Sequence, residues 1–362
     1  MRIAQVAPLY ESVPPKYYGG TERVVSYLTE QLVRQGHEVT LFASGDSVTA
    51  AQLRPGCDRA LRLHSRKVLD PLAYHIRMLE MVAAEADNFD LIHYHIDYLH
   101  FPVTRRLKTP ALTTLHGRLD IPELFPLYRD FQDMNLVSIS KWQRKPLPMA
   151  NWVATVYHGL PLDLFEPPQS NQTRGYLAFL GRICPEKRVD RAIEIARRVG
   201  IPLKVAAKID PADCEYFESE IRHLFDDPLV EYVGEIGEHE KAEFLGNACA
   251  MLFPIDWPEP FGMVLIESLA VGTPVIAYEM GSVPEIIEHG ITGYLVHDIE
   301  EAVKAVERVS SLDRRVCRRV FEERFSVQRM CRDYQTIYQR LTCRRAEEPL
   351  EFSNGTAATF VA

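Results

Sequence analysis

Short runs of apolar and β-branched residues alternate with longer stretches of helical period along the chain. In the first half these runs span residues 3–7, 38–43, 91–95, 111–115, 136–139 and 152–157. The second half repeats the pattern with runs at residues 176–180, 203–207, 231–233, 251–254, 274–278 and 294–296. Helix-periodic stretches, such as 21–34 and 71–85, lie between the runs. Strands that alternate with helices form parallel βαβ units, so the pattern predicts an α/β protein with two Rossmann-like halves.

Residues 161–174 interrupt this alternation and mark the expected domain boundary. The segment is polar, contains prolines and has no periodicity, as is common in linkers. We therefore expect an N-terminal domain over residues 1–160 and a C-terminal domain over residues 175–325. A last helix over residues 326–341 should cross back to the first domain. Residues 342–362, rich in polar and small side chains, should form a mobile tail.

The composition is that of an ordinary globular protein. Hydrophobic residues make up 46% and charged residues 25% of the 362 positions, which is enough for two real cores. The net charge of −9 argues against a nucleic-acid partner, because affinity for phosphate backbones needs an excess of Lys and Arg. No apolar run approaches the roughly 20 residues of a transmembrane helix. The basic clusters are typical of solvated helix faces, so membrane contact is not expected.

Cysteine usage and the first residues indicate the compartment. The chain has seven cysteines without a CxxC pair, and an odd number cannot all pair within one chain. The first residues have the pattern of a strand rather than of a signal peptide. We therefore expect a cytoplasmic protein.

Two glutamates flank the start of a nearly all-apolar stretch that should form a helix over residues 261–271, with Pro260 in its first turn. Glu267 is a charge on this otherwise buried element and must have a partner. At about 1.5 Å rise per residue, Glu259 lies up to ~12 Å from Glu267, too far for most hydrolytic carboxylate pairs and suited to two ends of one ligand. Between them lie amides that favour a diphosphate, those of Phe261, Gly262, Met263 and Val264. Without a ligand, the same pattern describes a core helix with one ion-paired Glu.

The Glu-Pro-Phe-Gly-x4-Glu arrangement, followed by Gly-Thr-Pro-Val-Ile-Ala, resembles the signature of family-4 glycosyltransferases. The resemblance implies the GT-B fold, in which two Rossmann-like domains face each other across a cleft. It also implies that Glu259 contacts hydroxyls of the donor sugar, that the amides after it hold the diphosphate, and that Glu267 binds the ribose hydroxyls.

A second motif places two cations after a strand that ends near Gly181. Arg182 and Lys187 precede the next helix, where cations favour phosphate, although each alone would more often be a surface charge. The resemblance assigns both to the donor diphosphate in place of a metal, and the chain has no Asp-x-Asp motif to hold one. We therefore expect a metal-independent enzyme without a cofactor. Arg188 stands where the family usually has Gly, which leaves the conformation of this loop open.

In the first half, two features resemble cleft-lining elements of the family. Gly19 and Gly20 join the first strand to a helix and let the backbone approach a phosphate or sugar closely, so the resemblance assigns them to the donor. His116, at a strand end before Gly117, resembles the histidine near the transferred sugar. Taken alone, a histidine at a strand end is usually structural.

The segment over residues 91–101 concentrates imidazoles and aromatic rings at another strand end. His93, His95 and His100 lack a nearby Cys or paired carboxylates, so acceptor binding or packing is favoured over a metal site.

The sequence thus predicts a retaining, metal-independent hexosyltransferase. Its partners would be a nucleoside diphosphate sugar, with UDP-glucose the preferred candidate, and an unidentified hydroxyl acceptor. Closure of the domains would bring His116 to the sugar. A nicotinamide-dependent dehydrogenase is disfavoured because neither half shows a Gly-x-Gly-x-x-Gly motif. A non-hydrolysing nucleotide-sugar epimerase of the same fold, or a non-catalytic nucleotide-sugar-binding protein, remains as an alternative.

Overall fold

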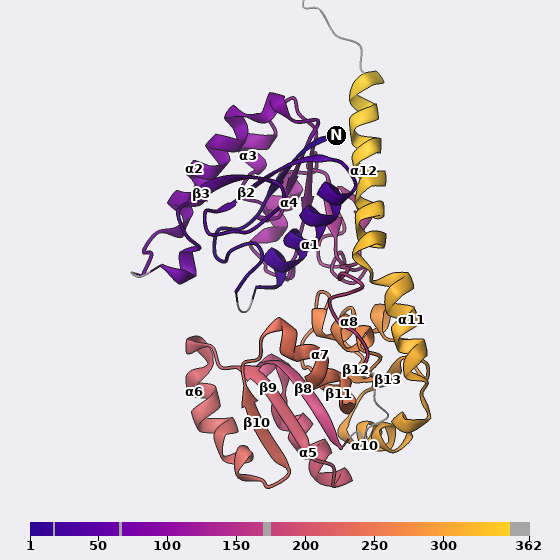
Figure 1. Ribbon diagram of the computed structural model, residues 1–362. Coiled ribbons are helices and arrows are strands. Elements are labelled where there is room, and N and C mark those ends of the chain that lie inside the picture. The colour runs from indigo at the N-terminus through magenta and orange to yellow at the C-terminus, as the bar shows by residue number, and fades with distance from the viewer. Residues whose placement is uncertain (17–18, 65–66, 169–174, 348–362) are drawn as a thin grey trace, which may run out of the picture.

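The protein folds into two α/β lobes, with the N-terminal lobe at the top of Figure 1. The computed structural model describes residues 1–16, 19–64, 67–168 and 175–347. Each lobe contains one sheet, and the paired strands within each sheet are parallel. The predicted α/β fold with two Rossmann-like units is therefore confirmed.

The N-terminal sheet has the strand order β3-β2-β1-β4-β5-β6-β7. Its strands are β1 Arg2–Val6, β2 Glu38–Ser44, β3 Gln52–Cys57, β4 Leu91–Tyr94, β5 Ala111–Thr114, β6 Leu136–Ser138 and β7 Trp152–Thr155. The helices of this lobe are α1 Gly20–Arg34, α2 Pro71–Ala84, α3 Phe101–Thr104 and α4 Leu124–Asp130.

The C-terminal sheet has the strand order β10-β9-β8-β11-β12-β13. Its strands are β8 Tyr176–Arg182, β9 Leu203–Lys208, β10 Val230–Gly234, β11 Ala248–Phe253, β12 Val275–Tyr278 and β13 Gly293–Val296. The α-helices that follow β8 are α5 Val189–Val199, α6 Cys214–Tyr216, α7 Glu238–Gly246, α8 Met263–Ala270, α9 Val283–Ile286, α10 Ile299–Arg308, α11 Arg314–Arg324 and α12 Val327–Glu347.

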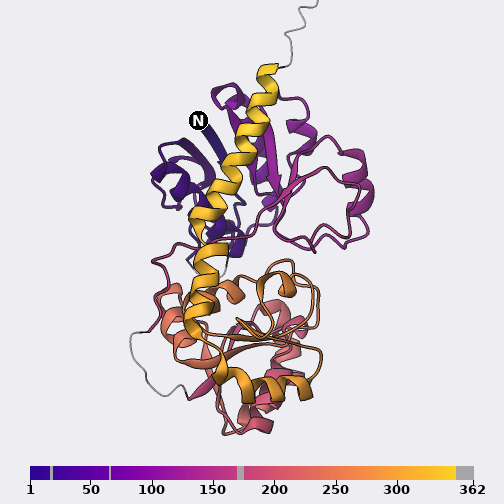
Figure 2. The same ribbon diagram turned by 90° about the vertical axis from the view of Figure 1, so that its right-hand side faces the viewer.

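Helix α12 returns to the N-terminal lobe and packs along it, as the two perpendicular views show (Figures 1 and 2). Its side chains Tyr334 and Tyr338 are fully buried and belong to an apolar cluster that also contains Leu28 of α1. The same cluster includes Phe261 and Phe325, so one core continues from one lobe into the other. None of the helices that the structure describes is long and apolar enough to cross a membrane.

The two chain crossings between the lobes bond to each other. The N–H of Leu160 donates to the carbonyl of Phe325 at 2.9 Å, and the N–H of Val327 donates to the carbonyl of Leu160 at 2.8 Å. A side chain at Gly159 could not fit there, because its Cβ would lie 2.4 Å from the carbonyl oxygen of Ser326. The two crossings therefore form one joint rather than two independent linkers.

Three expectations need correction. Strand β3 was missed because its sequence, Gln-Leu-Arg-Pro-Gly-Cys, holds a proline and a glycine that an edge strand tolerates. Helix α8 begins at Met263 rather than at residue 261, since Gly262 is left-handed (φ 82°), and Pro260 therefore lies before the helix. Helix α12 runs to Glu347, past the expected start of the tail at residue 342. The rest of that tail, residues 348–362, and linker residues 169–174 lie outside the described residues.

Candidate active site

Glu259 lies in the loop between β11 and α8, in direct contact with Lys187. The ammonium group of Lys187 pairs with the Glu259 carboxylate, and the indole N–H of Trp257 donates to the same carboxylate at 3.0 Å. The ammonium nitrogen also lies 5.3 Å and 5.4 Å from the ring centroids of Phe253 and Trp257. The structure thus brings together two residues that sequence reasoning assigned to one site from separate motifs.

The backbone of the Glu259 loop is held rigidly by the turn before α9. The N–H of Ser282 donates to the carbonyl of Glu259 at 2.9 Å, and its hydroxyl donates to the carbonyl of Phe261 at 3.0 Å. Gly281 packs so closely that a Cβ there would lie 2.4 Å from the backbone nitrogen of Glu259. A rigid loop of this kind can fix the direction of the Glu259 side chain.

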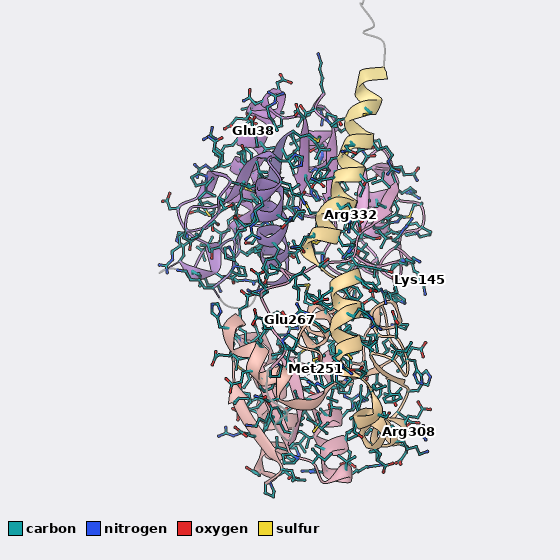
Figure 3. All side chains as sticks on the ribbon, turned by 45° about the vertical axis from the view of Figure 1, so that its right-hand side comes forward. Glu38, Lys145, Met251, Glu267, Arg308 and Arg332 are labelled. Carbon is teal, nitrogen blue, oxygen red and sulfur yellow. The ribbon has the colours of Figure 1, made fainter. Side chains whose placement is uncertain are left out.

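Helix α8 carries Glu267 into a buried position between the lobes (Figure 3). The side chain is 2% exposed, and one carboxylate oxygen accepts a hydrogen bond from Lys241 of α7 at 2.7 Å. The other oxygen, Oε2, is buried and has no partner among the residues that the structure describes. The first amides of α8, at Met263 and Val264, have no acceptor within the helix because of helix geometry. A carboxylate oxygen without a partner in the described residues, and amides without an acceptor inside their own helix, thus lie on one element.

The loop that carries Arg182 and Lys187 has a left-handed backbone at Arg188, a conformation that is usual for glycine. Arg188 has a φ of 51°, in the left-handed region that costs a non-glycine residue about 1–2 kcal/mol. Its guanidinium group is held by Asp190 at 2.7 Å and by Asp256 at 2.8 Å. These ion pairs offset the backbone strain and explain how the loop tolerates Arg at this position.

Arg182 ends β8, with its Nε 3.3 Å from the carboxylate of Asp213. The pKa of Glu186 is lowered, first by a hydrogen bond from its own backbone and also by the charges of Arg182 and Lys187. The charges of both cations therefore act on the same carboxylate.

The start of α1 touches the C-terminal lobe beside Glu267. Arg23 donates to Glu238 of α7 at 2.5 Å, and the hydroxyl of Tyr27 donates to the same oxygen. Gly19 is required by packing, because a Cβ there would lie 2.7 Å from Cβ of Pro15. A Cβ at Gly20 would meet nothing within 4 Å among the described residues. Residues 17 and 18 of the same loop are outside the described residues.

His116 reaches the start of α8 through a second imidazole. Its ring stacks on that of His158 with centroids 5.3 Å apart, and His158 meets the ring of Phe261 edge-on at 4.8 Å. Nε2 of His116 lies 2.9 Å from Nδ1 of His95. The Nδ1 atoms of His116 and His158 are buried and have no partner in the described part of the chain. The structure thus places His116 within two ring contacts of the Glu259 loop.

Burial keeps these imidazoles neutral at pH 7. It lowers the pKa of His116 to about 3. Burial, and to a lesser degree neighbouring imidazoles, lower the pKa of His95 and His158 well below its usual range. At neutral pH His116 is therefore an uncharged imidazole that can take part in hydrogen bonds but carries no positive charge.

The histidines of residues 91–101 are buried on β4 and in the segment that joins β4 to α3. His93 contacts hydroxyls of Tyr338 at 2.7 Å and Thr114 at 2.8 Å, and His100 contacts Thr104 at 2.8 Å. Within the ranges that the structure describes, no group of three or more His, Cys, Asp and Glu could hold a metal ion. The imidazoles of His93, His95 and His100 are all buried, which agrees with the packing interpretation of this segment.

Two family models match the chain. The model of glycosyl transferases group 1 covers residues 163–323, and the model of glycosyltransferase family 4 covers residues 18–189. This chain belongs to the family-4 glycosyltransferases. Together the two matches span both lobes of the GT-B fold, and a transferase therefore replaces the epimerase that the sequence left open.

Characterised relatives and solved structures agree with this assignment. N-acetyl-alpha-D-glucosaminyl L-malate synthase of Bacillus anthracis is 25% identical over 88% of this chain and 93% of its own. Sucrose-phosphate synthase of Thermosynechococcus elongatus superimposes with a TM-score of 0.77 at 19% identity, over 95% of this chain and 100% of its own. HepE of Anabaena, solved with UDP and glucose, has a TM-score of 0.72 at 15% identity, over 94% of this chain and 99% of its own.

Three residues beside the candidate site of this glycosyltransferase were not predicted from the sequence. His158 precedes Gly159 shortly after β7, and His116 precedes Gly117 shortly after β5, so both histidines give the same signal in the sequence. Gln5 is a fully buried amide in the central strand β1, where an apolar side chain is usual. Glu238 carried no local signal, because its partners Arg23 and Tyr27 lie in the other lobe.

Proposed function

We propose that this glycosyltransferase moves a hexose from a nucleoside diphosphate sugar to a hydroxyl group of its acceptor, with retention of configuration and without a metal ion. The observation that carries the proposal is Oε2 of Glu267, a buried carboxylate oxygen without a partner in the described chain. Such an oxygen is costly unless a donor reaches it. The two ribose hydroxyls of a nucleotide would supply the missing donors.

The donor would lie along the start of α8. Its ribose would bond Glu267, and its diphosphate would rest on the amides of Met263 and Val264, where the helix dipole favours negative charge. The sugar would then extend toward Glu259, whose backbone is clamped by Ser282. A Cβ at Gly20 would meet no described atom within 4 Å, so the backbone of the first lobe could approach the donor closely at this position.

Arg182 and Lys187 would neutralise the leaving diphosphate in place of a metal. Lys187 pairs with Glu259 in the structure, so we infer that donor phosphate replaces this carboxylate as its partner. The exchange would release Glu259 for the hydroxyls of the sugar. Charge on the diphosphate is greatest in the transition state, where fixed cations and helix amides contribute most. The departing phosphate oxygen would then take the proton of the acceptor hydroxyl on the same face of the sugar.

UDP-glucose is the donor that we propose to test first. HepE, which has the same fold, is solved with UDP and glucose, and this supports a uridine donor. We also infer that the enzyme works in the cytoplasm, because an odd number of cysteines without a CxxC pair is typical of a reducing compartment.

The test is hydrolysis of UDP-glucose to UDP and glucose in the presence of EDTA, with water in place of the unidentified acceptor, followed by NMR of the anomeric proton of the glucose as it is released. Wild-type protein should release UDP, and a Lys187→Ala variant should be strongly impaired. A Lys204→Ala variant, which removes a partly exposed cation, should behave as wild type. Activity that EDTA abolishes and Mg²⁺ restores would overturn the metal-free proposal, and an inverted product would overturn retention.

A further inference from the structure

A continuous chain of hydrogen bonds links the C-terminal helix α12 to His116. The amide oxygen of Gln5 lies 2.8 Å from Nε2 of His95, and the amide nitrogen of Gln5 lies 3.3 Å from the hydroxyl of Tyr338. The hydroxyl of Tyr338 lies 2.7 Å from Nδ1 of His93. At the other end, Nδ1 of His95 lies 2.9 Å from Nε2 of His116.

Proton counting along this chain gives it a direction. The amide nitrogen of Gln5 can only donate, so Tyr338 accepts from it and gives its own proton to His93. His93 must then carry its proton on Nε2, which faces the hydroxyl of Thr114 at 2.8 Å. Every hydrogen bond on this branch is satisfied with a neutral imidazole.

The other branch from Gln5 sets the proton of His116. The amide oxygen of Gln5 can only accept, so His95 carries its proton on Nε2 and leaves Nδ1 bare. The unprotonated Nδ1 of His95 accepts a hydrogen bond from the Nε2–H of His116. His116 must then leave its own Nδ1 without a proton. That Nδ1 is the buried atom without a partner in the described chain, beside the ring that leads to Phe261.

We infer that Gln5 and Tyr338 are positioning residues that hold His116 in its Nε2–H form, so that Nδ1 accepts a hydrogen bond from a hydroxyl of the transferred sugar. The inference rests on the proposed function for the identity of that hydroxyl. The proton order itself is a property of the free protein.

The opposite proton order would also satisfy these groups, and it makes the inference refutable. If the Gln5 amide were turned, His95 would carry its proton on Nδ1 and donate to His116. His116 would then present an N–H to the sugar instead of a lone pair. In the structure the amide nitrogen of Gln5 faces the hydroxyl of Tyr338 and its amide oxygen faces His95, and this orientation selects the first order.

The first experiment reads the proton order without any substrate. Protein labelled with ¹⁵N-histidine is measured by long-range ¹H–¹⁵N correlation at pH 7.5, and the His116 signals are identified by their loss in a His116→Asn variant. We expect a protonated Nε2 and an unprotonated Nδ1. A protonated Nδ1 on His116 in the wild-type protein would overturn the inference, whatever the enzyme transfers.

The second experiment uses two matched tyrosines of α12. Tyr338→Phe removes the hydroxyl that contacts the amide nitrogen of Gln5. Tyr334→Phe removes a hydroxyl that lies 2.9 Å from Thr114, at the far end of the branch that runs through His93. We expect mixed tautomers of His116 in Tyr338→Phe and the wild-type tautomer in Tyr334→Phe. We expect kcat with UDP-glucose to fall about 3- to 10-fold in Tyr338→Phe only, the value of one ordinary hydrogen bond. The affinity for free UDP should stay within about twofold in both variants, because His116 faces the sugar.

Two outcomes separate this inference from the proposed function. Equal losses of kcat in both tyrosine variants, with the same His116 tautomer, would assign the chain a purely structural role and overturn the inference. Absence of UDP-glucose turnover in the wild type would refute the proposed donor, while the tautomer measurement would still decide the proton order.

Discussion

The two glutamates of α8 and its preceding loop should respond differently to the same substitution. Glu267→Gln should weaken the binding of free nucleoside diphosphate. Glu259→Gln should leave that binding unchanged or make it slightly tighter. The difference follows from their partners, because Oε2 of Glu267 has none in the described chain, whereas Glu259 is occupied by Lys187.

The expected loss of UDP affinity in Glu267→Gln follows from the burial of the Glu267 carboxylate. The carboxylate is 2% exposed, and Lys241 takes one of its oxygens at 2.7 Å. In the Gln variant the remaining amide oxygen turns to Lys241, so the ribose hydroxyls meet an N–H₂ group that cannot accept from them. Losing a buried hydrogen bond of this kind costs about 1–3 kcal/mol. The dissociation constant for UDP should therefore rise roughly 5- to 150-fold.

Glu259→Gln should act on the sugar instead. Removing the carboxylate charge releases Lys187 from its ion pair and leaves it free for phosphate, so UDP should bind at least as well. The loss should appear in kcat with UDP-glucose and in discrimination between epimeric donor sugars, since a hydrogen bond to a sugar hydroxyl is directional.

The assay is isothermal titration of each variant with UDP in EDTA, beside steady-state kinetics with UDP-glucose. Glu231→Gln, which alters a carboxylate that is 57% exposed, is the matched control and should behave as wild type in both. If Glu259→Gln weakens free UDP as much as Glu267→Gln does, the assignment of the two ends of the donor is wrong.

Further predictions follow from the cations, the buried imidazoles and the contact between the lobes. Lys187→Ala should lower kcat more than it weakens UDP-glucose binding, because the diphosphate is most charged in the transition state; equal effects on both would contradict this. Burial lowers the pKa of His93 well below its usual value. As the pH falls below about 6.5, the unfolded chain therefore binds a proton at His93 that the folded chain does not bind. The free energy of unfolding that is present above that pH is then lost by up to about 1.4 kcal/mol per pH unit. The urea midpoint of His93→Gln should therefore fall less steeply from pH 7.5 to 5.5 than that of wild type or of His297→Asn, whose side chain is 67% exposed, and parallel curves would argue against it. Glu238→Gln weakens the bond from Arg23, so the radius of gyration in X-ray scattering should rise without donor and recover with UDP; an unchanged value would mean that this contact does not hold the lobes together.

The sequence predicted what depends on local pattern. Elements such as α1, α2 and β8 follow directly from period and turn residues, and the Glu-Pro-Phe-Gly motif indicates the family because its spacing is specific. The sequence assigned Lys187 to the diphosphate and Glu259 to the sugar of one donor, but it did not predict that the two side chains pair with each other. The local elements and the motif are fixed by residues close together in the chain.

What the sequence could not show depends on contacts over long separations. The bond between His93 and Tyr338 joins residues 245 positions apart, and that between Arg23 and Glu238 spans 215 positions. Neither partner carries a local sign of the other. The start of α8 was misplaced for a different reason, because the left-handed backbone of Gly262 is imposed by the clamped loop before it.

The most direct test of the donor site is a crystal structure of the enzyme with UDP-glucose grown in EDTA. The account predicts ribose hydroxyls within hydrogen-bond distance of Oε2 of Glu267, phosphate oxygens at Lys187 and at the first amides of α8, and a glucose hydroxyl at Glu259. A nucleotide bound elsewhere, or one whose ribose leaves Oε2 of Glu267 without a donor, would contradict it.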